Sequence, residues 1–164
     1  WSANTQGGSS LKWLVQGYKR RGLLFDRIFA WEATPHTTSE IFYGLPAQAL
    51  DAISYFNVPV DPTPGAKHNP LRTLLAVASE NDFVVLKIDI DVNPVEEALM
   101  EQVLGSKALL AAIDEIYFEH HVRPSPMWHK GWHKTTKPTN KSLADSYQLF
   151  TTLRQAGIRA HAWV

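Results

Sequence analysis

Hydrophobic and polar positions along the chain alternate between a helical and an extended spacing. Several segments carry apolar residues at helical intervals, begin at a capping residue and stop at a glycine or a loop. Between them lie short segments rich in aromatic and β-branched residues, which are typical of strands. The pattern predicts helices at 9–22, within 38–52, and at 69–80, 93–105 and 142–157, and strands at 25–32, 53–60, 83–90, 114–122 and 158–164.

Four of the predicted helix starts carry a capping signal. A side chain that accepts a backbone N–H stabilises the first turn, and a carboxylate three residues later can return the bond. Proline is favoured at the first helical position because its missing N–H costs nothing there. The predicted pairs are Asn69 with Pro70, Thr37 with Glu40, Asn93 with Glu96, and Ser142 with Asp145.

The segment "FVVLKIDI" (83–90) is almost continuously apolar. Such a run is expected of a strand that is buried on both faces of a parallel sheet. Together with the alternation of helices and strands, it predicts a three-layer α/β fold, Rossmann-like and doubly wound, with a mostly parallel sheet in a single domain over 1–164. Ligands of such sheets bind beyond the carboxyl ends of the strands. The polar residues at those positions are Glu32, Asp61, Asp89, Asp91, Glu119, His120 and His121.

Composition narrows the function classes. The chain has 164 residues, 45% of them hydrophobic, and 16 Lys plus Arg balance 16 Asp plus Glu. A balanced charge argues against a nucleic-acid surface, and no apolar run has the length of a membrane span. Because the chain has no cysteine, it forms no disulfide or thiolate zinc site. We expect a soluble domain that is intracellular or organellar rather than secreted.

Glu32 ends the strand 25–32, and the glycine-rich "QGGSS" leads into the first predicted helix. An acid at the end of an early strand can accept hydrogen bonds from a ribose, as in dinucleotide sites. Gly7 and Gly8 would let the backbone approach a cofactor closely. The alternative for Gly7 and Gly8 is a flexible loop at the N-terminus. The alternative for Glu32 is a solvated strand end.

Three stretches of the sequence resemble the class I S-adenosylmethionine-dependent methyltransferase fold. They are "FDRIFAWEA", "VVLKIDID" with "NPVEEALMEQVLG", and "IDEIYFEHH". They are most similar to FkbM-type and related algal and protist methyltransferase-like domains, over roughly residues 7–164. The resemblance implies that Gly7 and Gly8 lie beside the methionine part of S-adenosylmethionine, that Glu32 binds its ribose and that Asp61 lies near its adenine. It also implies that Asp89 and Asp91 face the substrate.

The sequence departs from this family in two places. The first strand of the fold has no counterpart before Trp1, so we expect the domain to be incomplete at its N-terminus. The family's Glu-Gly after the "KID" strand is replaced by Asp91-Val92. Two hypotheses follow: an enzyme that O-methylates a small or carbohydrate-like acceptor, and a non-catalytic accessory subunit of a protein complex.

Asp89 and Asp91 are spaced so that both carboxylates reach one side of an extended chain. The first interpretation is that they are acids of a methyltransferase-like site, and the second is that they form the polar end of a strand. A third alternative is a glycosyltransferase, in which Asp-x-Asp would hold a divalent metal on a diphosphate. No metal is favoured from the sequence.

His120 and His121 are adjacent, so they are expected to face opposite sides of the strand, with Glu119 on the side of His121. Either histidine can act as a general base, or else as a hydrogen-bonded structural residue. The loop 123–141 contains Trp128 and Trp132, which are expected to form a lid, a docking surface or a packed loop. His129 and His133 are four apart, but Gly131 disfavours the helix that a zinc site of this spacing needs.

Overall fold

Residues 10–124 and 139–163 are described by a computed structural model of the chain. The chain divides into two compact units, Trp1–Val60 and Asp61–Val164. Gly7 and Gly8, and the tryptophan and histidine positions between 125 and 138, lie outside the described residues.

Over its described residues 10–60, the first unit is a pair of parallel strands with three helices. Along the chain come α1 (Ser10–Lys19), β1 (Ile28–Trp31), α2 (Thr38–Phe42), α3 (Ala47–Ala52) and β2 (Ile53–Phe56). Strand β1 pairs with β2 in parallel, with Ile28 opposite Ile53. The buried core of the first unit contains Val15 of α1, Ile28 of β1, Leu45 and Ala49.

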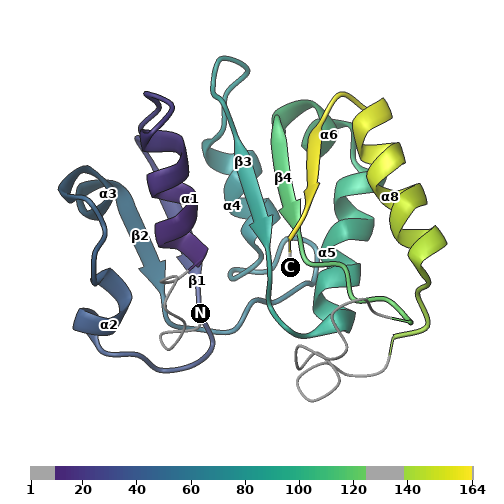
Figure 1. Cartoon of the computed structure of the whole chain (residues 1–164), viewed down its shortest axis with the longest axis horizontal. Helices are drawn as coiled ribbons and strands as arrows, with labels where there is room; N and C mark the ends of the chain where they lie inside the picture. The colour runs from purple at the N-terminus through teal and green to yellow at the C-terminus, as the bar shows by residue number, and fades with distance from the viewer. Residues whose placement is uncertain (1–9, 125–138, 164) are drawn as a thin grey trace. The chain divides into compact units, whose positions relative to one another are not determined.

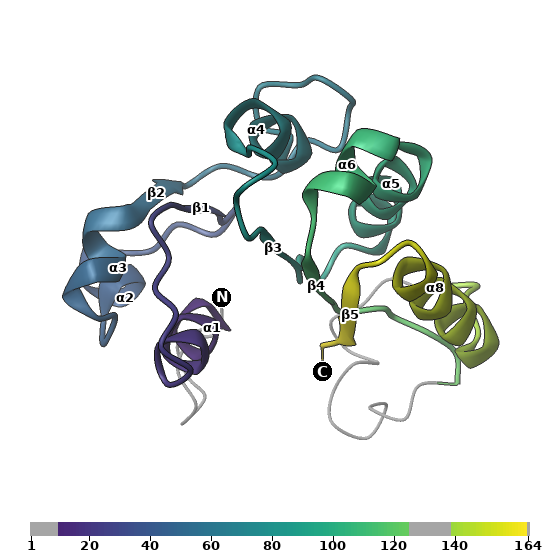
Figure 2. The ribbon, with the colours of Figure 1, turned by 90° about the horizontal axis from the view of Figure 1, so that it is seen from above.

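The second unit, as far as its residues 61–124 and 139–163 are described, is a three-stranded parallel sheet with helices packed against it. Its elements are α4 (Pro70–Val77), β3 (Val85–Ile88), α5 (Asn93–Gly105), α6 (Lys107–Ala112), β4 (Glu115–Phe118), α8 (Leu143–Gln155) and β5 (Arg159–Ala162). The strand order is β3-β4-β5, with Ile88 opposite Phe118 and Phe118 opposite Ala162. The three strands run side by side in Figure 1, and Figure 2 shows α5, α6 and α8 together on one face of this sheet.

The core of the second unit lies between that face and the helices. The largest fully buried apolar side chains here are Phe118 and Ile116 of β4, Leu99 and Val103 of α5, and Leu153 of α8. Every residue of β4 is buried, because β4 is the central strand. Strand β3 instead alternates between half-buried and buried residues. The prediction that 83–90 is buried on both faces holds only in part: within β3, Leu86 and Ile88 are buried, whereas Val85 and Lys87 are half-buried.

The helix starts agree with the capping signals in three of four cases. Asn69, Thr37 and Ser142 are N-caps whose side chains accept backbone N–H groups, and Glu40 and Asp145 complete capping boxes. Asn93 is not a cap but the first residue of α5, which follows Val92. The sequence did not predict α6, a six-residue helix that Ser106 caps directly after α5.

The chain is thus an α/β protein whose described strands are parallel and lie in two small sheets, of two and three strands. The single domain, its incomplete start and the doubly wound arrangement stay predictions. Among the described residues, no helix combines the length and apolar character needed to cross a membrane.

Candidate functional site

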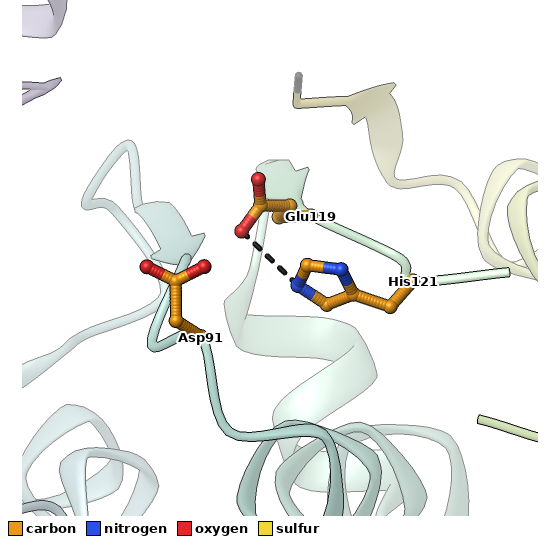
Figure 3. A group of neighbouring side chains, drawn as sticks. All are labelled: Asp91, Glu119 and His121. Atoms are coloured by element: carbon orange, nitrogen blue, oxygen red, sulfur yellow. Dashed lines mark ion pairs between the residues drawn. The ribbon is translucent and has the colours of Figure 1, made fainter. Parts of the chain in front are cut away.

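Polar side chains meet where β3 and β4 end. Because the two strands are parallel and Ile88 is opposite Phe118, the segments that follow them leave the same edge of the sheet. The backbone N–H of Glu119 donates to the carbonyl of Ile88 at 3.0 Å, which holds the two segments together. Figure 3 shows Asp91, from the turn after β3, facing Glu119 and His121, which follow β4.

Asp91, Glu119 and His121 form the centre of the site. One ligand-type atom from each lies within 4.8 Å of the others. Glu119 and His121 are buried and form an ion pair, with 3.3 Å between Glu119 Oε2 and His121 Nε2. Asp91 is exposed, and its φ of 59° places it in the left-handed region, which Asp adopts more readily than most residues. The site therefore has two enclosed groups and one group that faces solvent.

Glu96, in the first turn of α5, supports this centre. The residue is 1% exposed, and its Oε1 accepts the N–H of Ile90 at 2.8 Å. Its Oε2 lies 3.8 Å from His121 Nε2. Glu96 therefore holds the 89–92 turn against α5 instead of capping the helix at Asn93, so the predicted capping box is wrong.

Lys87 and Asp89 form an ion pair on the same edge of the sheet. The Lys87 ammonium also lies 4.4 Å from the ring centre of Trp163, a cation–π arrangement. Burial lowers the pKa of Lys87, and Asp89 partly offsets this. Burial also acts to raise the pKa of Asp89, but Lys87 and a hydrogen bond with Glu119 hold it below its ordinary value. Asp89 is therefore a carboxylate that is already paired.

Glu119 and His121 have pKa values shifted toward their protonated forms. Burial raises the pKa of Glu119 to about 7, although His121 opposes the shift. Burial acts to lower the pKa of His121, but the adjacent Glu119, followed by Glu96 and Asp91, raises it overall. Groups that gain or lose a proton near neutral pH are suited to proton transfer. Glu119, as its carboxylate, can therefore accept a proton from a bound hydroxyl group.

His120 lies in different surroundings from His121, as the alternation of the strand predicts. Its ring stacks on Phe118, with 5.3 Å between centres, and Phe118 in turn contacts Phe150 of α8. Burial, with help from Lys141 and His121, lowers the pKa of His120 to about 4. His120 is therefore a neutral imidazole on the helical side of the sheet, and the structure does not bring it into the centre formed by Asp91, Glu119 and His121.

Glu32 follows β1 in the first unit, and its side chain bonds locally. Its Oε1 accepts the N–H of Thr34 at 2.7 Å, and its Oε2 lies 3.9 Å from His36 Nε2. Asn57 donates to the Glu32 carbonyl at 2.7 Å. These contacts order the turn after β1.

Asp61 opens the second unit with an equally local bond. Its Oδ1 accepts the N–H of Thr63 at 2.9 Å, and this bond lowers the pKa of the exposed carboxyl. Such a bond is an Asx turn, which explains an Asp before Pro-Thr-Pro-Gly without a ligand. The predicted roles of Glu32 and Asp61 toward ribose and adenine stay predictions.

The sequence indicated Glu119 among the polar residues at the strand ends and as a neighbour of His121, but it missed Glu96 as part of the site. A signal for Glu96 was present: positions 96, 99, 100 and 103 form one helical face, and the last three are apolar. A carboxylate on the buried face of a helix needs a polar partner. That requirement could have placed Glu96 against the chain segments after β3 and β4.

The neighbourhood brings together four carboxyl groups, one ammonium and one imidazole. Like charges at such distances need protons or a cation to balance them. The group can thus transfer a proton or bind a positive ion. No model of a known protein family matches this sequence, and comparison with curated proteins and with solved structures likewise yields no similar protein.

Proposed function

We propose that the chain is an S-adenosylmethionine-dependent methyltransferase, built on a Rossmann-like core, that methylates an oxygen of a small or carbohydrate-like acceptor. The observation that supports this most is the convergence of Asp91, Glu119 and His121 at the carboxyl edge of parallel strands. In parallel α/β sheets this edge is where reacting groups are placed. The fold class and the "VVLKIDID" resemblance agree with it.

S-adenosylmethionine would supply the methyl group as an electrophilic sulfonium. The residues fit this cofactor in kind: Glu32 follows a parallel strand, and a carboxylate oxygen that accepts one N–H can accept a ribose hydroxyl as well. The acceptor hydroxyl must lose its proton as its oxygen gains the methyl group. Glu119, whose Oε2 lies 3.3 Å from His121 Nε2, would take that proton as its carboxylate. Asp89, paired with Lys87 and bonded to Glu119, is a positioning residue.

Calorimetric titration of the full chain with S-adenosylmethionine and S-adenosylhomocysteine, in a buffer containing EDTA, tests this proposal. We expect saturable binding of both compounds. Glu32→Gln should weaken it at least about tenfold, because an amide loses the charge-assisted bonds to ribose. The exposed Glu80→Gln is the matched control and should bind as the wild type does.

Absence of saturable binding to either compound would overturn the proposal. The accessory-subunit hypothesis would then be preferred, and the next experiment would be a search for a protein partner. Binding that survives Glu32→Gln unchanged would remove Glu32 from the cofactor site.

A further inference from the structure

We propose that Asp91, Glu119 and His121 bind a divalent first-row transition cation of the Mn²⁺ class at the carboxyl edge of the three-stranded sheet. The sequence alone favoured no metal here. Its Asp-x-Asp suggested Asp89 with Asp91 as the ligands, whereas in the structure Asp89 pairs with Lys87.

The distances are close to those of a coordinated ion. Ligand atoms at about 2.1 Å from one ion lie at most about 4.2 Å apart. Adjacent ligand atoms on such an ion lie only about 3 Å apart, and the three groups lie within 4.8 Å of one another, so binding requires a movement of roughly 1–2 Å. Asp91 can make that movement, because it is exposed and lies on a turn, while Glu119 and His121 are fixed by burial.

A second observation is that one buried oxygen of Glu119 lacks a hydrogen-bond donor among the described residues. Glu119 Oε2 is buried, and within the described part of the chain it accepts no hydrogen bond of ordinary geometry. Its contact there is the ion pair with His121 at 3.3 Å. A buried carboxylate oxygen normally has a full set of partners. A cation between Glu119, His121 and Asp91 would complete its coordination.

The charges around the centre favour a cation as well. Glu96 lies 3.8 Å from His121, and the negative charge of Asp89 acts on Glu119 as well. The nearby Lys87 is already paired with Asp89. A divalent ion would relieve the repulsion among the remaining carboxylates.

The donor set selects the class of ion. Two carboxylates and one imidazole combine the oxygen ligands that suit Mg²⁺ and Mn²⁺ with a nitrogen ligand that suits transition metals. Mn²⁺ accepts both kinds, whereas Ca²⁺ sites are built from oxygen alone. Three protein ligands with an exposed Asp91 would leave positions for water or substrate, as in catalytic rather than structural sites.

This inference deepens the proposed function and depends on it for the role of the ion. A bound cation lowers the pKa of a coordinated hydroxyl group. It would then activate the acceptor oxygen in place of the Glu119–His121 pair. The binding of the ion itself requires neither S-adenosylmethionine nor an acceptor.

The test is a titration of the full chain with Mn²⁺ in the absence of S-adenosylmethionine. Binding is measured by electron paramagnetic resonance and by calorimetry. We expect one saturable site, and at least about tenfold weaker binding in Asp91→Asn. Asparagine tolerates a positive φ, so this variant keeps the turn and the exposed surface. The control is Glu101→Gln, which removes a carboxylate from the exposed side of α5 and should bind Mn²⁺ as the wild type does.

Glu119→Gln is a second variant, with its fold checked by circular dichroism, and it should also lose the site. The inference is overturned if the wild type shows no saturable Mn²⁺ binding, if Asp91→Asn retains full affinity, or if Glu101→Gln weakens binding equally. The cofactor titration contains EDTA, and the metal titration contains no cofactor. Each proposal can therefore fail without affecting the interpretation of the other titration.

Discussion

At the scale of single residues, Asn69 ties three segments of the second unit together. Its Oδ1 caps α4 by accepting from Leu71 at 2.9 Å, and its Nδ2 donates to the Thr63 carbonyl and to Gln102 Oε1. Gln102 of α5 in turn donates to the Pro62 carbonyl at 2.7 Å. One amide thus joins the 61–68 loop, the start of α4 and the side of α5.

Asn69→Ala should destabilise the protein by about 2–4 kcal/mol, because the cap is lost and buried partners are left unsatisfied. Asn69→Ser keeps an acceptor for the cap and should fall between the alanine variant and the wild type. The measurement is urea unfolding followed by circular dichroism. Asn81→Ala, on an exposed turn, should change stability by no more than about 0.5 kcal/mol. Equal effects of the Asn69→Ala and Asn81→Ala changes would contradict the role of the buried amide.

The same residue shows what the sequence could predict. Asn-Pro before an apolar helical pattern was enough to place the cap at Asn69. The two donor bonds of its amide depend on Thr63 and Gln102, and the Gln102 partner lies 33 positions away. Local spacing carries no information about such a partner. For the same reason Glu96 was interpreted as a cap, although its partners follow β3 and β4.

At the scale of elements, helix limits were predicted better than strand limits. The α5 range agrees with the prediction at both ends because Asn-Pro and Gly105 mark them. Strands β2 and β3 are four residues long where about eight were expected, since apolar residues continue beyond the last pair of the ladder. Helix α6 was missed because six residues are too few to show a helical period.

The start of α8 makes a prediction about pH. Asp145 Oδ2 accepts from the N–H and the hydroxyl of Ser142, each at 2.7 Å, and these bonds hold the pKa of Asp145 below its ordinary value. A depressed folded pKa gives stability that is present above the unfolded pKa and is lost as the pH falls through the folded value. Asp145→Asn should therefore lower the melting temperature at neutral pH, and the difference from wild type should shrink toward about pH 3.

Thermal unfolding of both proteins across this pH range measures the difference. The matched control is Thr151→Ala, which changes an exposed, uncharged side chain of the same helix and whose effect should not change with pH. If the difference in melting temperature between Asp145→Asn and the wild type stays constant down to the lowest pH, the capping box does not cause the pH dependence.

At the scale of the whole molecule, the two units differ in what each can bury. The fully buried large side chains Phe118, Leu99, Ile116, Leu153 and Val103 all belong to residues 61–164. The first unit has a small core around Val15 and Ile28 and, among its described residues, a sheet of two strands. Small cores and two-stranded sheets are marginally stable in water.

We therefore expect the fragment 61–164 to fold alone, with a cooperative urea transition, and the fragment 1–60 to show none. Because Asp91, Glu119 and His121 all lie in 61–164, this fragment should also bind Mn²⁺ with the affinity of the full chain. Separate expression of the two fragments, followed by circular dichroism and Mn²⁺ titration, measures both properties.

If 61–164 fails to fold, the chain is one cooperative domain, as its sequence predicts. If it folds but does not bind Mn²⁺ while the full chain does, the first unit contributes to the metal site.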